Sequence, residues 1–463
     1  MSDSKSTPII AIATGNGNAG IGILRLSGPQ KSVTEISSKL FSGKKLESRY
    51  AYLLPIHDKD GEIIDRGIVI FFAAPFSYTG ESVLEIQVHG GRASLEFIQN
   101  ELLDRFSDLG LRLANPGEFT ERAFLNGKID LIQAEATADL IEASTLQSVK
   151  AASRSLRGDF SKEISKLNDE LINLRVEVEA MLDFPEEEID FINQYGSRDK
   201  IESIKKHLED IIKNAKQGEI LRDGLRVAII GETNVGKSSL LNALAGEEVA
   251  IVSDIAGTTR DRIKTSINIS GVLFHFVDTA GIRETNDAIE KIGIERSKQE
   301  ISNADIVLQI LDVTSLNDED HKKLDDLLHT IKKEDVPVIR VFNKSDLLDS
   351  SQHSISIVSR ETVISTSAVT GAGLQELKNA LIKLSGVTDN YSVYSARERH
   401  LNLLKAASLH LNQASDFIKS NNPQLELFAE ELRESSDNLG EIIGKTTSDD
   451  LLGKIFSGFC IGK

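Results

Sequence analysis

The sequence predicts an α/β domain with a mostly parallel sheet, inserted into a discontinuous helical domain and preceded by a small α+β domain. Three observations predict this architecture. Short apolar runs alternate with turn residues up to about residue 125, and helical spacing fills residues 131–212 and 396–443. Between residues 224 and 384, strand-like runs alternate with helical patterns. A length of 463 residues allows about three domains.

The composition limits the classes of function. Hydrophobic residues make up 40% and charged residues 27%, as in an ordinary soluble protein with a buried core. A net charge of −18 argues against a broad basic surface for nucleic acid, so any such contact should be local or supplied by a partner. One cysteine excludes an internal disulfide framework. Without a basic-then-apolar leader or a run of about 18 apolar residues, we expect a cytoplasmic protein.

The first part of the chain predicts a sheet with a helix. Runs rich in Ile, Val and Phe predict strands at residues 8–14, 21–26, 67–72 and 83–88, and apolar spacing predicts a helix at 93–106. Gly15, Gly17 and Gly20 match a G-x-G-x-x-G spacing. That fingerprint requires a helix next, whereas a strand follows here, so we reject a dinucleotide site.

The next part predicts long helices. Apolar residues spaced alternately by four and three form a seam that ends before Pro185: Leu156, Phe160, Ile164, Leu167, Leu171, Leu174, Val178 and Met181. Similar spacing resumes after residue 396, with a break at Pro423. The shared character favours one discontinuous domain, and two unrelated helical segments are the alternative. We therefore expect segments at 1–125, 126–220, 221–384 and 385–463.

The inserted segment begins with a phosphate-binding pattern. Residues 226–230 predict a buried strand, residues 231–238 fit G-x-x-x-x-G-K-[ST], and a helical run follows. Backbone N–H groups of such a loop converge on phosphate oxygens at a helix N-terminus. Lys237 would reach the phosphates, and the Ser238 hydroxyl would bind magnesium. Alone, the pattern could be a glycine-rich turn, and it does not distinguish ATP from GTP.

Further motifs follow the other predicted strands, at 274–277, 306–311, 338–342 and 363–365. Asp278-Thr279-Ala280-Gly281 suits magnesium and the γ-phosphate. In Asn343-Lys344-Ser345-Asp346 a carboxylate can accept two hydrogen bonds from guanine, which adenine cannot offer. Ser367-Ala368 can back the base, and residues 257–261 lie where a switch loop belongs. Together these motifs resemble those of translation-factor-related GTPases and predict GTP.

One position departs from many Ras-like GTPases. Ile282 stands where those proteins place a glutamine that orients the attacking water. Asn234 offers an oxygen beside the phosphates, and residues 252–255 offer carbonyls, a ligand type that suits potassium. A bound potassium ion could neutralise the developing charge. The alternative is that Asn234 is a simple turn residue.

The whole chain resembles the MnmE (TrmE) family of tRNA-modification GTPases. The resemblance rests on the GTPase motifs and on residues 22–28, 84–91, 116–128 and 459–463 (Phe-Cys-Ile-Gly-Lys). It implies that the N-terminal domain dimerises and binds a tetrahydrofolate one-carbon donor, 5,10-methylene- or 5-formyl-tetrahydrofolate. The implied folate ligands are Arg25, Glu85, Lys128 and Lys463.

The resemblance also implies that GTP is hydrolysed when two G domains meet. It assigns potassium to Asn234, Ser253, Ile255 and Thr258, and magnesium to Ser238 and Thr259. Glu290 would position water through a second molecule and act with Asn234 in catalysis, although its chemistry alone suggests a solvated helix residue. The expected GTP-binding residues are Asn234, Val235, Gly236, Lys237, Ser238, Ser239, Ser253, Asp254, Ile255, Ala256, Gly257, Thr258, Thr259, Asp278, Thr279, Ala280, Gly281, Asn343, Lys344, Asp346, Ser367 and Ala368.

The resemblance further implies a partner, MnmG, which uses FAD and NADH. The two proteins would form a heterotetramer and build aminomethyl or carboxymethylaminomethyl groups at C5 of the tRNA wobble uridine, position 34. The alternative is a regulatory GTPase of ribosome or RNA assembly that modifies nothing. Such a protein would carry a basic RNA-binding appendage. Cys460 is left out of the catalytic set because a free cysteine is usually a small packing residue.

Overall fold

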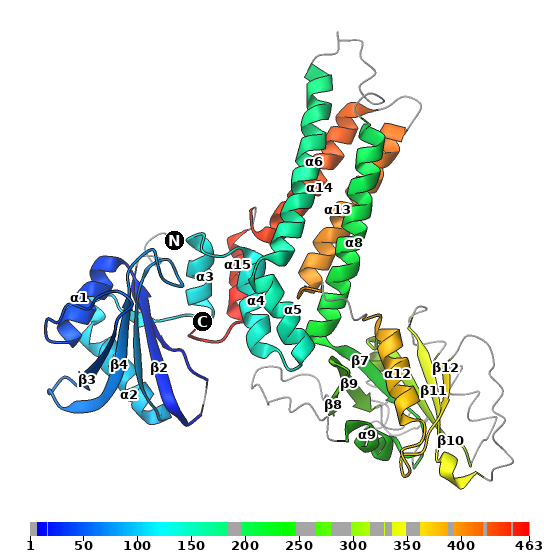
Figure 1. Ribbon diagram of the computed structural model, residues 1–463, viewed down its shortest axis with the longest axis horizontal. Helices are drawn as coiled ribbons and strands as arrows, with labels where there is room; N and C mark the ends of the chain where they lie inside the picture. Colours follow the sequence, from blue (N-terminus) through cyan, green and yellow to red (C-terminus); the bar gives the residue numbers. More distant parts are fainter. Residues whose placement is uncertain are drawn as a thin grey trace, which may run out of the picture. The chain divides into compact units, whose positions relative to one another are not determined.

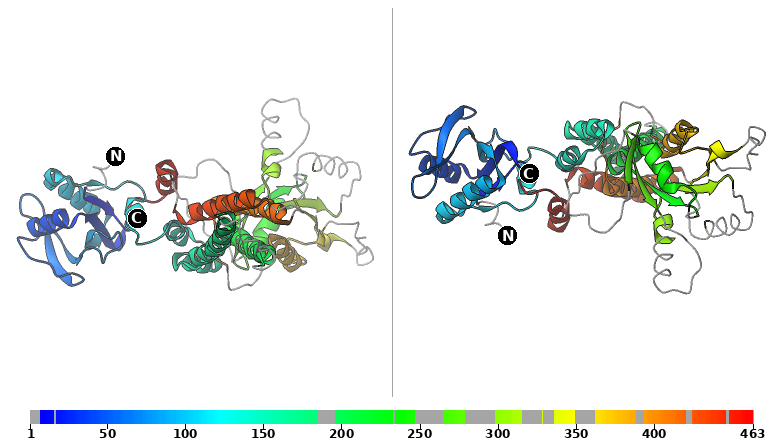
Figure 2. Two further views of the ribbon diagram at one scale, coloured as in Figure 1. Left: turned by 90° about the horizontal axis from the view of Figure 1, so that it is seen from above. Right: turned by 90° about the horizontal axis from the view of Figure 1, so that it is seen from below.

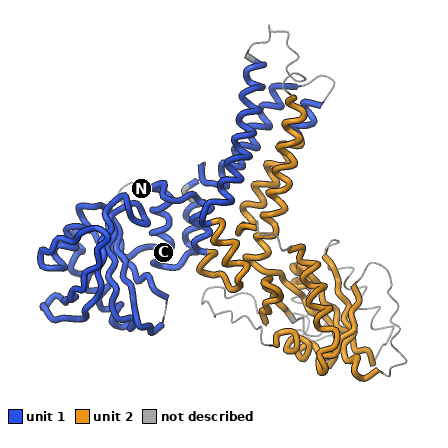
Figure 3. The backbone as a smooth tube through the Cα atoms, viewed as in Figure 1, with its two compact units in different colours: residues 1–138, 156–194, 413–463 blue, residues 139–155, 195–412 orange. Residues whose placement is uncertain are grey.

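The computed structural model describes residues 7–15, 17–183, 196–232, 234–246, 265–278, 298–314, 328, 336–348, 362–387, 393–419, 424–445 and 448–462. The chain divides into two compact units (Figure 3). Residues 1–138, 156–194 and 413–463 form the first unit, and residues 139–155 and 195–412 form the second. The four predicted segments follow a different division and stay a prediction.

The first unit contains a six-stranded sheet (Figure 1) with the order β3-β4-β5-β2-β1-β6. Its strands are β1 (Ile9–Ile12), β2 (Ala19–Gly28), β3 (Ala51–His57), β4 (Ile63–Phe72), β5 (Ser82–Gly90) and β6 (Arg112–Leu113). All neighbours are antiparallel except β1 and β6. Because β1 and β2 pair antiparallel across the glycine-rich turn, the rejection of a dinucleotide fold there is confirmed.

The two faces of this sheet differ in character. Helices α1 (Gln30–Leu40) and α2 (Arg92–Arg105) pack on one face, where alternate strand residues form the core (Figures 1 and 2). The core includes Leu24, Leu26, Val33, Ile36, Leu84, Ile86, Val88, Leu95 and Ile98. On the other face Ile9 packs with Phe119 of α3 (Glu118–Leu125). Because side chains alternate along a strand, Arg25 and Glu85 lie on the face opposite to that core.

One expectation about the helical segments is wrong. The predicted single helix from Leu156 is interrupted, because α5 (Leu146–Leu156) ends there and α6 (Asp159–Asp183) begins three residues later. Gly158 between them has φ +82°, a left-handed conformation that a continuous right-handed helix cannot include. The sequence analysis also did not predict α1, β3 or β6.

Among the described residues, five further helices lie outside the two sheets and the helices packed on them: α4 (Leu131–Glu142), α8 (Ser197–Asp223), α13 (Glu398–Lys419), α14 (Leu425–Ile443) and α15 (Asp449–Ser457). In the first unit α6 packs along α14, where the Ser436 hydroxyl donates to Asn168 Oδ1 at 2.7 Å. In the second unit α8 contacts the segment before α13, and a Cβ on Gly218 would lie 1.9 Å from the Tyr394 carbonyl oxygen. Pro185 and Pro423 lie outside the described residues. None of the helices in the described part of the chain combines the length and apolarity needed to cross a membrane.

The second unit contains a sheet with the order β12-β11-β10-β7-β9-β8. Its strands are β7 (Leu225–Ile230), β8 (Thr265–Ile269), β9 (Val272–Asp278), β10 (Ile306–Asp312), β11 (Val338–Asn343) and β12 (Thr362–Ser365). Only β8, which was not predicted, runs antiparallel to its neighbour. Helices α9 (Lys237–Ala245) and α12 (Leu374–Ser385) pack on one face, and Ile301 and Leu328 on the other. The predicted mostly parallel sheet is confirmed.

Candidate functional site

The predicted nucleotide motifs lie at one edge of the second sheet. The phosphate loop follows β7, Asp278 ends β9, Asn343 ends β11, and Ser367 comes two residues after β12. These strands are parallel, so their carboxyl ends share an edge, where ligands bind in open α/β sheets.

The phosphate loop requires glycine at two positions. A Cβ on Gly231 would lie 2.4 Å from the Ile310 carbonyl oxygen, and one on Gly236 would lie 2.4 Å from Asn343 Nδ2. Asn234 has φ +68°, a conformation that asparagine tolerates better than most residues. Lys237 begins α9, and its Nζ donates to the carbonyls of Gly231 and Glu232 at 2.7 and 2.9 Å. The ammonium group therefore lies over the loop, and Ser238 and Ser239 follow Lys237 in the first turn of α9.

The buried Asn343 side chain joins three motifs. Its Nδ2 donates to the Val235 carbonyl of the phosphate loop at 2.9 Å. Its Oδ1 accepts from the Ala368 N–H at 3.2 Å and from the Thr366 hydroxyl at 3.4 Å. Because Asn343 is only 1% exposed, these bonds do not compete with water. The structure therefore brings the predicted residues Val235, Asn343 and Ala368 together.

Two further side chains of the predicted base site have fixed partners. The Ser367 hydroxyl donates to Asp346 Oδ1 at 2.5 Å, and Lys344 Nζ donates to Asp312 Oδ2 at 2.5 Å. Lys344 itself has φ +66°. Burial raises the pKa of Asp312, but hydrogen bonds from Lys344 and Thr314 outweigh that effect and lower it overall. Asp312 is therefore a carboxylate anion when it binds the Lys344 ammonium group.

Asp312 was not among the predicted site residues, although the sequence contains a signal for it. Asp312 comes directly after the predicted strand 306–311, just as Asp278 and Asn343 follow theirs. An acidic residue at the carboxyl end of a buried parallel strand was therefore reason enough to consider it.

Several predicted site residues lie outside the described residues. They are Ser253, Asp254, Ile255, Ala256, Gly257, Thr258, Thr259, Thr279, Ala280, Gly281, Glu290 and Lys463. Of the predicted potassium ligands only Asn234 is described, and of the predicted magnesium ligands only Ser238.

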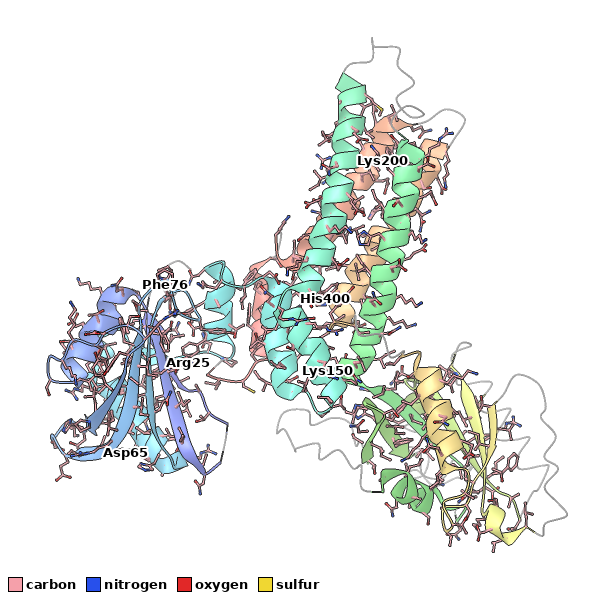
Figure 4. All side chains as sticks on the ribbon, viewed as in Figure 1. Arg25, Asp65, Phe76, Lys150, Lys200 and His400 are labelled. Carbon is pink, nitrogen blue, oxygen red and sulfur yellow. The ribbon has the colours of Figure 1, made fainter. Side chains whose placement is uncertain are left out.

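A second group of predicted residues lies on the first sheet. Arg25 on β2 and Glu85 on β5 are opposite each other, and Arg25 Nε donates to Glu85 Oε1 at 2.9 Å. Their side chains are 24% and 16% exposed, so the pair is half-buried yet reachable. The Arg25 guanidinium carbon lies 6.0 Å from the Tyr78 ring centre and 5.9 Å from that of Phe119, within cation–π range. Figure 4 shows Arg25 on the side of the sheet toward α3.

Loop 73–81 connects this pair to Lys128. Tyr78 in the loop faces Arg25, and its hydroxyl forms a hydrogen bond of 2.9 Å with Thr120 in α3. Lys128 Nζ donates to the Pro75 carbonyl at 3.1 Å, and the stem of Lys128 packs beside Gly80. The structure therefore places Arg25, Glu85 and Lys128 around one loop.

A buried ion network supports the same region and was not predicted. Arg122 donates to Glu81 and Glu118 at 3.0 and 2.8 Å, and Arg112 donates to Glu118 at 2.6 Å. Burial raises the pKa of Glu118, but hydrogen bonds from Arg112, the Asn115 N–H and Arg122 outweigh it, so the pKa is lowered. The network fixes α3 against the loop. Glu118 and Arg122 lie four residues apart, a spacing at which helix side chains meet, whereas Glu81 is 41 residues from Arg122, so no local spacing reveals that contact.

The C-terminal segment packs against α3 and β1. Gly117, with φ +68°, is the N-cap residue of α3, and a Cβ there would lie 2.7 Å from the Phe456 carbonyl oxygen. The Gly117 N–H donates to the Cys460 carbonyl at 3.4 Å. A Cβ on Gly462 would lie 2.3 Å from the Ile12 carbonyl oxygen. Residues 456–462 are therefore built into the first unit, with Cys460 exposed.

Two family models match the chain. The "GTP-binding protein TrmE N-terminus" matches residues 8–128, and the "MnmE helical domain" matches residues 131–460. Solved structures similar to part of the chain include a variant of Era from Aquifex aeolicus bound to GDP and aluminium fluoride. It is 29% identical, with a TM-score of 0.28, over 40% of this chain and 66% of that one.

Curated relatives match over the full length. A tRNA modification GTPase MnmE of Bordetella parapertussis is 50% identical, covering 98% of this chain and 99% of the relative. Another, from Burkholderia mallei, is 48% identical and covers both chains completely. Identity at this level over the whole length, together with the two family models, shows that the chain belongs to the MnmE family of tRNA modification GTPases.

Proposed function

We propose that this chain is a potassium-stimulated GTPase that hydrolyses GTP when the G domains of two copies meet. Its cycle controls a modification made with MnmG, which installs an aminomethyl or carboxymethylaminomethyl group at C5 of the tRNA wobble uridine, position 34. Tetrahydrofolate supplies the carbon. The chain forms a homodimer and, with MnmG, a heterotetramer.

In the nucleotide site, Asp346 recognises guanine and Lys237 the phosphates. The hydrogen bond from Ser367 supports this role for Asp346, because it fixes the carboxylate beside the motif that follows β12. Ser238 and Thr259 bind magnesium. The hydroxyl of Ser238 suits that role, because magnesium prefers oxygen ligands at the start of the helix after a phosphate loop.

Asn234 binds potassium with Ser253, Ile255 and Thr258, and Glu290 positions the attacking water. The left-handed conformation of Asn234 supports a special role, since a residue there is usually glycine unless a side chain is needed. A potassium ion would supply positive charge beside the phosphates. Ile282 cannot orient water, which is why another residue must do so.

Arg25, Glu85, Lys128 and Lys463 bind the folate. A pterin ring offers N–H groups to a carboxylate and a flat face to aromatic rings, and its glutamate tail pairs with cations. The half-buried Arg25–Glu85 pair beside Tyr78 and Phe119 supplies these chemical groups, so the residues present fit the cofactor. When bound, the folate would supply a one-carbon unit, and these residues would hold it on the sheet.

The observation that carries the GTPase part is the Asn343 side chain, which links three motifs into one nucleotide site. The modification part is tested by expressing the chain in a bacterium that lacks its own MnmE protein. Mass analysis of tRNA nucleosides should then show the modified wobble uridine restored, and Glu85→Gln should fail to restore it. An unmodified uridine with the parent chain, in cells that make MnmG, would defeat the proposal.

A further inference from the structure

Two passages of the chain connect helices to the nucleotide-binding sheet of the second unit. Residues of both passages contact the carboxylate of Asp139. The first passage runs from α8 through Gly224 into β7, and the second runs from α12 through residues 393–397 into α13. Arg222 Nε and Arg397 donate to Asp139 Oδ1 at 2.8 and 2.7 Å. The Ser395 hydroxyl donates to Asp139 Oδ2 at 2.6 Å. We name Asp139, Arg222, Ser395 and Arg397 the junction cluster.

The junction cluster is buried, which makes its geometry strict. The Asp139 side chain is only 4% exposed, so both of its oxygens depend on these three donors. A buried ion pair gives little net stability compared with apolar packing, and its usual advantage is a fixed arrangement. Further bonds hold the second passage, because the Ser395 N–H donates to the Ala151 carbonyl and Ser155 Oγ donates to the Ser395 carbonyl. Asp139 therefore sets the position of both passages together.

The first passage is in rigid contact with the nucleotide site. His275 on β9 donates from Nε2 to the Asp223 carbonyl at 3.0 Å, and its Nδ1 accepts from Ser266 at 2.8 Å. Burial lowers the pKa of His275 and favours this neutral form. A Cβ on Gly224 would lie 2.6 Å from the Leu273 carbonyl, so α8 ends directly against β9. Since β9 ends at Asp278, a shift of this strand reaches Arg222 within a few residues.

Arg222 in the cluster pairs with two carboxylates at once. Arg222 NH1 pairs with Asp223 at 2.8 Å while its Nε pairs with Asp139, so one guanidinium is shared by two carboxylates. A cavity of about 50 Å³ lies beside them, lined by Asp139, Glu142, Ser148, Arg222, Asp223 and other residues. That volume can hold water, which allows side chains to exchange partners. An exchange of Arg222 between its two carboxylate partners would be a two-state change of the kind that transmits a signal.

Asp139 belongs to α4, and this helix leads toward the one-carbon site along the chain. The helix begins at Leu131, three residues after Lys128, and ends at Glu142. A helix moves as a rigid rod over so short a length. A displacement at Asp139 is therefore carried along α4 to Leu131, three residues after Lys128 in the sequence.

We propose that Asp139 is a positioning residue that couples GTP turnover at the second sheet to tRNA modification. When the bound nucleotide changes, a shift of β9 reaches α4 through the junction cluster. The contacts of Asp139 within the cluster then either form or break. The proposal rests on the two activities of the family and requires neither potassium nor a particular folate.

The test compares two activities in Asp139→Asn. This variant keeps the size and one acceptor oxygen of Asp139 but removes the charge that pairs with the two arginines. We expect GTP turnover of the full chain within about twofold of the parent and at least a tenfold loss of modified tRNA nucleoside in cells. Asp139→Glu, which restores the charge, should recover part of the modification. Asn168→Ala is the matched control, because it removes one buried hydrogen bond between α6 and α14 without touching the junction.

Retained modification in folded Asp139→Asn would overturn the proposal. The proposal would also fail if Asp139→Asn lost GTP turnover and tRNA modification together, in proportion to a lower melting temperature, as Asn168→Ala does. If Asp139→Asn does not fold, Ser395→Ala removes a single bond of the second passage and should lower modification while leaving turnover intact. Retention of both activities in Ser395→Ala would then contradict the proposal.

A second measurement is independent of tRNA. Amide hydrogen exchange of residues 131–142 should differ between the GDP-bound and GTP-analogue-bound parent, and this difference should disappear in Asp139→Asn. Exchange in α4 that does not respond to the nucleotide in the parent would contradict the coupling. If hydrogen exchange in α4 depends on the nucleotide but the parent restores no modified uridine, the proposed tRNA chemistry is wrong, and the coupling between the nucleotide site and α4 is still supported.

Discussion

At the scale of single residues, the predicted base site depends on Asp312, which was not among the predicted ligands. Asp312 holds the ammonium group of Lys344, while Thr314 donates to the same carboxylate from its N–H and its hydroxyl. With its ammonium fixed, the stem of Lys344 can form a flat support for a base. Specificity thus depends on a residue that follows β10, in addition to the motif after β11.

The first prediction concerns this pair. Asp312→Ala should release Lys344 and speed the dissociation of GDP by roughly fivefold, because a partly exposed ion pair contributes about 1 kcal/mol. Stopped-flow measurement with a fluorescent GDP analogue gives the rate. Asp305→Ala is the control, since Asp305 accepts from the Arg226 N–H at the opposite edge of the sheet. An unchanged rate in Asp312→Ala would show that Lys344 needs no anchor.

A second prediction concerns pH. The pKa of folded Glu118 lies below its ordinary value of 4.5, so the stability that its charge contributes is complete above that pH. It is lost as the pH falls from 4.5 through the folded pKa. Glu118→Gln should cost about 3 kcal/mol near neutral pH, because it leaves the buried Arg122 without a full partner.

Urea unfolding at several pH values measures this difference. The gap between parent and Glu118→Gln should narrow below pH 4.5. Glu96→Gln, which breaks an exposed pair with Arg92, should show a small and nearly constant gap. A gap for Glu118→Gln that stays the same at acid pH would mean that its charge does not stabilise the fold.

At the scale of elements, sequence patterns predicted whatever was local. The phosphate loop and the motif after β11 were found because each joins a buried apolar strand to a short set of polar residues. The strand β3 was missed because Pro55 interrupts a run whose alternation is weak. The strand β8 was also missed, although β12, an edge strand of only four residues, was predicted. The sequence contains no local sign that Arg122 meets Glu81 or that Asp139 meets Arg397, since these pairs exist only after folding.

The third prediction concerns the joint between α3 and the C-terminal segment. Gly117→Ala should push Phe456 away, because a Cβ would lie 2.7 Å from its carbonyl oxygen. We expect tRNA modification to fall at least tenfold while GTP turnover persists, since the nucleotide site lies in the other unit.

Gly43→Ala is a matched control for this change. Gly43 also has a positive φ, +78°, but a Cβ there would meet nothing within 4 Å. Both variants bear the same backbone strain, roughly 1–2 kcal/mol, and only Gly117→Ala adds the collision. Equal effects of the two substitutions on modification would show that strain alone is responsible.

At the scale of the whole molecule, the proposed cation response requires two copies. GTP turnover per molecule should rise with protein concentration in potassium and stay low in sodium, because the two G domains must meet. Asn234→Ala should remove the difference between the two salts. Asn268→Ala is the control, since Asn268 Oδ1 only accepts from the Gly271 N–H in the turn between β8 and β9. Equal turnover of the parent in both salts would contradict a potassium role.

The packing of residues 456–462 against Gly117 and Ile12 has a consequence for biosynthesis. A ribosome that adds about 5–20 residues per second completes this segment about 20 to 90 s after β1. The first sheet can form early, but the joint with α3 cannot. A chain released before residue 456 would therefore lack the segment that packs against Gly117 and Ile12.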